Sequence, residues 1–414
     1  MATYVSIPHG NRINTGRTST VAPNLLWSRS DRLIGTFRTV GWGNIERKDA
    51  CGGYIGVNRL LQTTTSTLMA TAYLGLDLHA NSSTLGVMAS DGTYQGHQQF
   101  STAESELIPR VSSVDAQEKR LAVEASELSR WAARTIDPYV DQVLVCDPRG
   151  NFLISRDGRK DDVSDAYNLC RLLRLGELQE VYQAEEDHRA VFKATAQHYL
   201  DCRGQQVALK QKIKATFRRW GVLDLDGREV YSTDGRDRYL EQISQPQITR
   251  QLRRLYRMHD EAVQAQSDAQ SQMKRLGKQY PEIEVFQEVP GVGPIGSHLF
   301  DAFIQTPHRF STRQKLWRYC QLGVRSRTSD GKPLGYEELD PNGRSELKQV
   351  SYRAYVAAVK QGDNAVETFF EQSLRRTRDQ THARLNTQRK ILATLRALWK
   401  TGTSYRPEKF LGSA

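Results

Sequence analysis

Alternating and apolar runs over residues 71–146 predict a sheet with helices packed on it. Apolar stretches at 73–78 and 84–89 indicate buried strands, and the Ser90-Asp91-Gly92 turn leads to a third strand at about 95–100. Strands joined this closely favour an antiparallel meander. The next expected elements are a helix, a strand, a helix and a strand, at about 102–117, 120–125, 127–136 and 142–146.

This order of elements predicts an α/β domain over 69–200. Three hairpin strands followed by strand–helix alternation are typical of a ribonuclease H-like (RuvC-like) mixed sheet with helices on both faces. Actin-like ATPases begin with the same meander, so topology alone leaves both folds open.

From about 178 the pattern becomes helical. Within 201–280 a polar-centred seam follows steps of four and three residues, at Ile248, Leu252, Leu255, His259, Ala262, Gln266, Ala269, Met273 and Leu276. Such a seam predicts a coiled-coil arm, either intramolecular or dimerising, with a tip within Gly221–Arg238. A mainly helical domain is expected at 281–400, followed by a basic tail at 401–414.

Residues 1–68 are rich in Gly, Ser, Thr, Asn and Arg and poor in acids, without a helix or strand period. This composition predicts a disordered extension. An organelle transit peptide and a mis-assigned start, with Met69 as the natural first residue, are the alternatives.

The chain of 414 residues has a formal net charge of +11, and its excess charge is clustered. Residues 371–414 hold 10 basic and 3 acidic residues, and residues 201–280 hold 16 basic and 10 acidic ones. Phosphate backbones select such clusters, because neutralising phosphates releases counterions. The 5 scattered cysteines form no CxxC pair, and no long apolar run predicts a membrane span or a signal peptide. A cytosolic partner of nucleic acids is expected.

Four acids fall where their side chains could converge. Asp77 lies inside the first strand, Glu124 ends the fourth, and Asp162 and Asp165 begin an apolar helix on one face. In a ribonuclease H-like sheet the first and fourth strands are neighbours. Clustered carboxylates repel unless cations bind, and oxygen ligands favour Mg²⁺ or Mn²⁺. A pair of such ions stabilises the attacking and leaving oxygens of phosphodiester displacement. An ordinary acidic helix start is the alternative for Asp162 and Asp165.

Two further segments carry candidate chemistry in the helical domain. The Gly291-Val292-Gly293 turn resembles a helix-hairpin-helix, whose backbone N–H groups hold DNA phosphates, although a plain helix–helix turn has the same pattern. Residues 325–332 form a basic, polar loop in which a serine could attack phosphate, with Arg325, Arg327 and Lys332 offsetting charge. Loop serines more often act as caps or turn residues.

Together these segments resemble the IS-one-ten family of insertion-sequence transposases, relatives of the Piv DNA invertases. The resemblance covers about 71–400 and rests on 74–82, 121–126, 161–166, 290–294 and 309–331. It implies that Asp77, Glu124, Asp162 and Asp165 are a DEDD metal site and that Ser329 is the nucleophile. Where the family has Ser-Gly this chain has Ser329-Asp330-Gly331, which leaves Ser326 as a lesser candidate. The family's Thr-Asp helix start is Asp161-Asp162 here.

The resemblance further implies recombination of donor and target double-stranded DNA under a structured noncoding guide RNA, the bridge RNA. Acids and serine from different subunits of a dimer or tetramer would form a composite site giving a phosphoserine intermediate, in the nucleoid of a prokaryotic cytoplasm. A RuvC-type nuclease or junction resolvase, an inactive nucleic-acid-binding relic, and an actin-like ATPase are the competing interpretations.

Overall fold

The structure is a computed structural model, which describes residues 69–148, 161–184, 186–325, 328–329, 332–333 and 338–412; for 328–329 and 332–333 it describes the backbone alone. The predicted disordered extension over 1–68 therefore lies outside the described residues, as do Ser326 and Arg327. Among the helices that are described, none is both long and apolar enough to span a bilayer.

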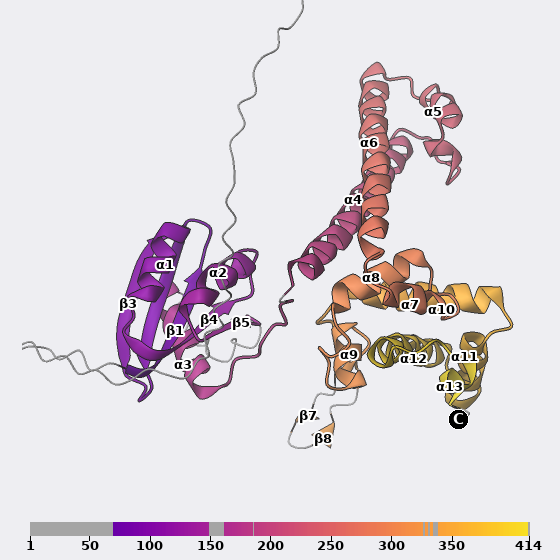
Figure 1. The fold of residues 1–414 in the computed structure, drawn as a ribbon. Coiled ribbons are helices and arrows are strands. Elements are labelled where there is room, and N and C mark those ends of the chain that lie inside the picture. Colours follow the sequence, from indigo (N-terminus) through magenta and orange to yellow (C-terminus); the bar gives the residue numbers. More distant parts are fainter. Residues whose placement is uncertain are drawn as a thin grey trace, which may run out of the picture. The chain divides into compact units, whose positions relative to one another are not determined.

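A five-stranded mixed sheet forms the first part of the described chain (Figure 1). Its strands are β1 (Met69–Leu78), β2 (Ser82–Ala89), β3 (Tyr94–Ser101), β4 (Ala116–Glu124) and β5 (Gln142–Cys146). They lie in the order β3-β2-β1-β4-β5. β1 pairs antiparallel with β2 and parallel with β4, and β5 is parallel to β4. The predicted meander and the adjacency of the first and fourth strands are confirmed.

Helices cover both faces of this sheet. On one face α1 (Glu104–Ser112) and α2 (Ser129–Ile136) pack on strand residues such as Leu74, Leu76 and Leu121. On the other face α3 (Asp162–Leu175) packs through Leu169 and Leu173. The alternation of apolar side chains along β1 and β4 supplies both faces, because successive residues of a strand point to opposite sides.

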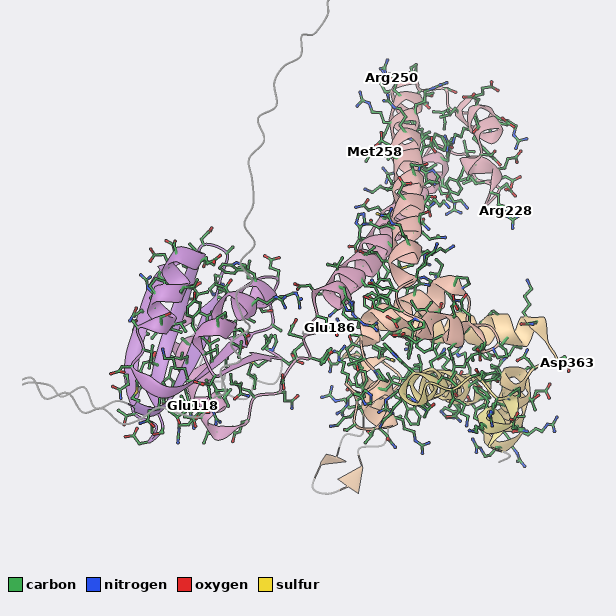
Figure 2. The ribbon with its side chains drawn as sticks, viewed as in Figure 1. Glu118, Glu186, Arg228, Arg250, Met258 and Asp363 are labelled. Carbon is green, nitrogen blue, oxygen red and sulfur yellow. The ribbon has the colours of Figure 1, made fainter. Side chains whose placement is uncertain are left out.

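The helical seam forms an intramolecular arm. α4 (Asp187–Arg219) packs along α6 (Pro246–Gly277), and the segment between them holds the 3-10 helix η4 (Glu229–Tyr231) and α5 (Thr233–Leu240). Of the predicted seam, Leu252, His259, Ala262, Ala269 and Met273 are buried. Figure 2 shows Arg250 and Met258 on α6 and Arg228 on the segment that connects α4 to α6.

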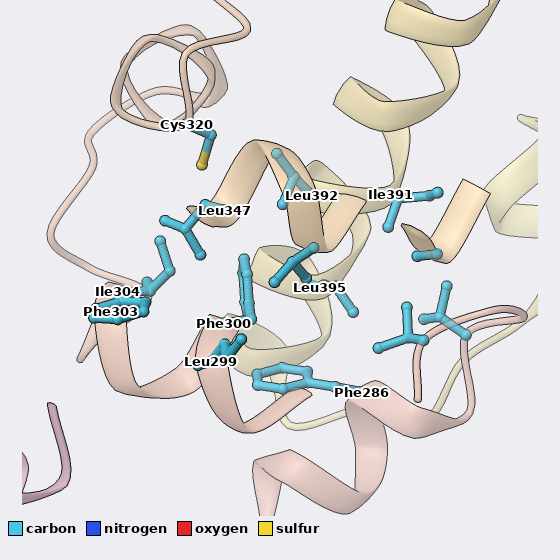
Figure 3. Close-up of a cluster of buried hydrophobic side chains, with 14 of the residues drawn as sticks. Phe286, Leu299, Phe300, Phe303, Ile304, Cys320, Leu347, Ile391, Leu392 and Leu395 are labelled. Carbon is cyan, nitrogen blue, oxygen red and sulfur yellow. The ribbon is translucent and has the colours of Figure 1, made fainter. Parts of the chain in front are cut away.

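The remaining helices share one core. They are α7 (Glu282–Gln287), α8 (Pro294–Ile304), α9 (Arg313–Tyr319), α10 (Ser345–Gln361), α11 (Ala365–Thr377), α12 (Gln380–Thr401) and α13 (Pro407–Leu411). The rings of Phe286 and Phe300 pack edge to face in this core, with their centroids 5.1 Å apart, beside Leu395 (Figure 3). Parts of α4 and α6 contribute to the same core, through Phe192 and Met273 among others.

Several element boundaries differ from the sequence expectations, among them those of β4, α4 and α13. The strand β4 begins at Ala116, inside the span predicted as helix. The helix α4 runs without a break through the expected boundary at 200/201. Within the expected basic tail, α13 is folded and buries Phe410, which is 1% exposed.

Candidate active site

Asp77 and Glu124 end neighbouring parallel strands. The last pair of the β1–β4 ladder joins Leu76 and Val123, each of which directly precedes one of the two acids. The buried apolar residues around Leu76 fix the register, since a slip by one residue would turn every side chain to the opposite face. The structure therefore places both strand acids at the same edge of the sheet, as predicted.

The N-terminus of α3 supplies the other two acids. Asp161 is the N-cap: its Oδ1 accepts hydrogen bonds from the backbone N–H groups of Val163 and Ser164 at 2.9 and 3.0 Å. The hydrogen bond from Ser164 is the main cause of the lowered pKa of Asp161. Thr and Asp are both good N-caps, so Asp161 serves where the resembling family has Thr. The cap leaves Asp162 and Asp165 in the first helical turn.

Glycines let α3 lie directly on the sheet. A Cβ added to Gly75 would stand 2.2 Å from the carbonyl oxygen of Ala166 and 2.8 Å from the amide nitrogen of Cys170. A Cβ on Gly86 of β2 would also be tightly placed, 3.2 Å from the same carbonyl oxygen. Only glycine allows this approach of two backbones, which carries the start of α3 toward Asp77.

An unpredicted histidine lies between the strand acid and the helix acid. The Nε2 of His79 is 3.2 Å from Oδ2 of Asp77 and 3.7 Å from Oδ1 of Asp162. One donor atom from each of these three residues lies within 4.8 Å of the others. The Asp77 side chain is 13% exposed, against 43% for Asp162 and 56% for His79, so the group opens to solvent on one side.

The environment of Asp77 opposes its negative charge. Burial is the largest cause of its raised pKa, opposed by His79 and reinforced by the carboxylates of Asp162, Asp165 and Glu124. Its Oδ2 is buried and accepts no hydrogen bond from the described residues. Nε2 of His79 lies 3.2 Å from this oxygen but without the geometry of a hydrogen bond. A buried carboxylate whose charge is opposed by burial and by three more carboxylates is a setting that a divalent cation would stabilise. The side chains at this edge therefore fit a hard cation, although the imidazole adds a nitrogen to the expected oxygen ligands.

Ser329 lies in a small antiparallel ladder. β7 (Thr328–Ser329) pairs with β8 (Lys332–Pro333), with Ser329 opposite Lys332. A second ladder joins β6 (Val324–Arg325) to β9 (Glu338–Leu339). Within the segment expected to be a basic, polar loop, the described residues therefore form two short ladders between α9 and α10, and we call 324–339 the ladder segment.

Contacts of Asp340 and Pro341 hold the ends of the ladder segment to the helical domain. Nε of Arg318 lies 3.1 Å from Oδ2 of the buried Asp340. The backbone N–H of Asp340 donates to the carbonyl of Gly323 at 2.9 Å, and Nε2 of Gln321 donates to the carbonyl of Pro341 at 2.6 Å. These contacts fix the two points at which the ladder segment connects to the helical domain.

The predicted Gly-Val-Gly turn lies between α7 and α8. Gly291 has φ +82°, and a Cβ there would stand 2.0 Å from the carbonyl oxygen of Ala354 in α10. Packing of the turn against α10 therefore explains this glycine. Gly293 is the exposed N-cap of α8 and meets no neighbour within 4 Å of an added Cβ. Its open surroundings leave room for the predicted phosphate contact, whereas Gly291 has a packing role.

Comparison with known proteins bears on the helical domain. None of the curated proteins matches the chain. Residues 283–371 match the sequence model of the Transposase IS116/IS110/IS902 family. The matched stretch runs from α7 into α11 and includes Gly291, Gly293 and Ser329. This match supports an IS110-family transposase.

Proposed function

We propose that the chain is an insertion-sequence transposase that cuts and rejoins DNA strands with a divalent cation and a serine nucleophile. The observation that carries the proposal is the approach of Asp162 on α3 to Asp77 at the end of β1, with Glu124 on the adjoining strand. The sheet order and its two helical layers favour a ribonuclease H-like domain as the frame for these acids.

Asp77, Glu124, Asp162 and Asp165 would hold Mg²⁺, or Mn²⁺. When bound, such ions stabilise charge on the attacking and leaving oxygens of a phosphodiester. The protein's own part is positional: the β1–β4 register fixes Asp77 and Glu124, and the Asp161 cap fixes the helix that carries the other two acids. His79 lies against both Asp77 and Asp162, and its Nε2 would be a further ligand.

Ser329 is the proposed nucleophile. Its Oγ would attack the scissile phosphorus and give its proton to water, forming an Oγ–P bond while the P–O bond to the departing strand breaks and the departing oxygen takes up a proton. Lys332, its partner in the β7–β8 ladder, and Arg325 are proposed to offset charge on the phosphate, together with Arg327. The exposed N-cap Gly293 would hold a neighbouring phosphate of double-stranded DNA.

The proposal includes a guide RNA, with sequence choice delegated to base pairing and the protein binding shape and backbone. The basic residues of the arm and of α11–α13 would hold RNA and DNA. A dimer or tetramer would bring the acids of one subunit to the serine of another, in the nucleoid of a prokaryotic cell.

The test is a search for a covalent protein–DNA adduct. The protein is purified with RNA from the flanking noncoding DNA, then given Mg²⁺ and labelled donor DNA, and analysed under denaturing conditions. We expect an adduct that Ser329→Ala and Asp162→Asn each abolish. Ser326→Ala should retain it, because Ser326 is the lesser candidate.

The matched control is Asp161→Asn, which makes the same charge change one residue away and keeps a capping side chain. It should form the adduct, so its failure would point to a displaced helix rather than a lost ligand. Cleavage that persists in Ser329→Ala without any adduct would contradict the serine mechanism and favour a RuvC-type nuclease, whose chemistry needs the acids alone.

A further inference from the structure

A concave site among the C-terminal helices is lined by positively charged side chains. It lies among α9, α11, α12 and α13 and has a volume of about 680 Å³, and most of its lining residues, among them Tyr405, Arg406 and Lys409, follow the matched family stretch. Figure 1 shows α12 beside α11 and α13. Its lining includes no acid but six cationic side chains: Arg313, Arg376, Arg389, Lys390, Arg406 and Lys409. Its volume lies within the ~300–1,000 Å³ of ordinary ligand sites.

Most of these cations have no acidic partner. Within the described part of the chain no ion pair is formed by Arg313, Arg376, Lys390, Arg406 or Lys409, whereas many other arginines of the chain do pair with acids. Arg313, Arg376, Arg406 and Lys409 are exposed at the rim, and Lys390 is half-buried. An uncompensated group of like charges is stabilised by a bound anion.

Lys390 is a half-buried cation of this lining. Its Nζ lies 5.7 Å from the ring of Phe369 and 5.6 Å from the ring of Phe410. Burial, followed by repulsion from Arg313, lowers its pKa. The two rings hold the amine by cation–π attraction while leaving its N–H donors without an anion.

Aromatic faces and hydroxyls complete the lining. The indole of Trp317 is fixed by its Nε1–H, which donates to the carbonyl of Arg389 at 3.0 Å, and the guanidinium of Arg313 lies 5.7 Å from the ring. Oη of Tyr405 is buried and has no hydrogen-bond partner among the described residues. Thr394 and Ser404 add further hydroxyls. Fixed aromatic rings beside cations are what unpaired bases and their phosphates bind.

The folded end of the chain closes this site. The backbone N–H of Tyr405 donates to Oε2 of Glu288 at 2.7 Å, and Phe410 meets Phe369 edge to face at 5.7 Å. Burial, helped by Glu408, raises the pKa of Tyr405 to about 12. The two acids near Tyr405 stay outside the lining.

We infer that this site, which we call the C-terminal pocket, binds an unpaired nucleotide of a single-stranded nucleic acid. Lys390, Arg406 and Lys409 contact its phosphates, and Trp317 or Tyr405 stacks on its base. A hollow of this size admits one splayed nucleotide, whereas a duplex keeps its bases stacked inside. The inference rests on the proposed function, because it supplies that enzyme with a contact to the unpaired strands that recombination and guide pairing create.

The test measures, by fluorescence anisotropy, the affinity of the full chain for three labelled ligands. They are a 12-nucleotide single-stranded DNA, a single-stranded RNA of the same sequence and the matching duplex DNA. We expect the double variant Arg406→Glu/Lys409→Glu to lose about tenfold in affinity for a single strand. Lys390→Gln should weaken binding in the same direction. Whichever single strand, DNA or RNA, the double variant binds with the larger loss of affinity is the source of the nucleotide.

Lys315→Glu/Lys360→Glu is the matched control, with the same charge change at two exposed lysines that lie outside the lining and outside the arm and α11–α13. It should bind single strands within about twofold of the unchanged protein. Equal losses in the control and the pocket variant would overturn the inference, as would equal losses for duplex and single strands. A polyglutamate peptide that displaces the oligonucleotide as well as a nucleoside monophosphate does would also overturn it.

Failure of the inference can be told apart from failure of the proposed function. Asp162→Asn should bind single strands normally and form no adduct. If Arg406→Glu/Lys409→Glu binds normally while Ser329-dependent adducts form, the pocket is wrong and the transposase stands. If the pocket variant loses binding while the unchanged protein forms no adduct, the pocket stands without the serine mechanism.

Discussion

His79 is the residue of the candidate active site that the sequence did not single out. It follows Asp77 by two residues, a spacing that keeps alternate strand residues on one side of a sheet. Asp77 itself was identified because an acid inside an apolar strand needs a partner. The identity of that partner could not be read, because Asp162 reaches His79 only through the packing of α3.

Replacing His79 should change the choice of cation. Imidazole nitrogen suits Mn²⁺ better than Mg²⁺, whereas carboxylates serve both. We expect His79→Ala to weaken Mn²⁺ binding about tenfold and Mg²⁺ binding about twofold or less. Isothermal titration with each ion measures this, and His97→Ala, at an exposed strand position, is the control. Equal losses for the two ions would contradict a ligand role for the imidazole.

Lys193 on α4 offers a pH-dependent test of the helical domain. Burial lowers its pKa to about 8, and Arg309, Arg344 and Arg130 add to the effect. Because the unfolded chain holds this proton more tightly, the charged lysine lowers the free energy of unfolding below pH 8. That cost disappears as the pH rises toward about 10.5.

Lys193→Met should therefore stabilise the protein at pH 7 by on the order of 2–3 kcal/mol. The gain should shrink steadily between about pH 8 and pH 10.5. Urea unfolding of both proteins across this range measures the difference. Lys360→Met, at an exposed position of α10, should show no such trend. A gain that is constant with pH would indicate improved packing rather than removal of a charge.

At the scale of elements, strands defined by apolar runs were predicted best. The range of β5 coincides with its prediction, whereas the prediction missed the first half of β4 and took Ala116 and Gln117 for helix. That half is polar, and it is a strand because it pairs with the start of β1: Oγ1 of Thr71 donates to Oε2 of Glu118 at 3.1 Å. Local periodicity cannot reveal a pairing across 47 residues.

The contact between α3 and β1 gives a prediction about element placement. In Gly75→Ala the new methyl group would collide with backbone atoms of Ala166 and Cys170, so α3 must move away from the sheet. We expect a loss of about 1–3 kcal/mol in the free energy of unfolding. We also expect Mg²⁺ to raise the melting temperature of the unchanged protein but not that of Gly75→Ala, because Asp162 moves with the helix.

Gly204→Ala is the control for this change. Gly204 lies within α4 and an added Cβ meets nothing within 4 Å, so alanine should stabilise the helix by about 0.5–1 kcal/mol. Thermal unfolding with and without Mg²⁺ separates the two variants. A Gly75→Ala protein that keeps its full response to Mg²⁺ would show that the metal site does not depend on this close approach.

At the scale of the whole molecule, the proposed chemistry is divided between distant parts of the chain. The acids belong to the sheet and α3, and Ser329 belongs to the ladder segment of the helical domain, some 160 residues later in the sequence. The sequence indicated both parts through residue types and spacing. It could not say whether they meet within one chain, because no local pattern records how domains pair.

Mixing two inactive variants decides between one chain and two. If acids and serine come from different subunits, a mixed dimer of Asp162→Asn and Ser329→Ala holds one complete composite site out of two. Random mixing makes half of the dimers mixed, so adduct formation should return to about a quarter of the unmixed level. Asp162→Asn mixed with Asp165→Asn should stay inactive, since both changes damage the same acid site on α3. Recovery in the first mixture alone establishes a site shared between subunits, and no recovery in either mixture places acids and serine in a single chain.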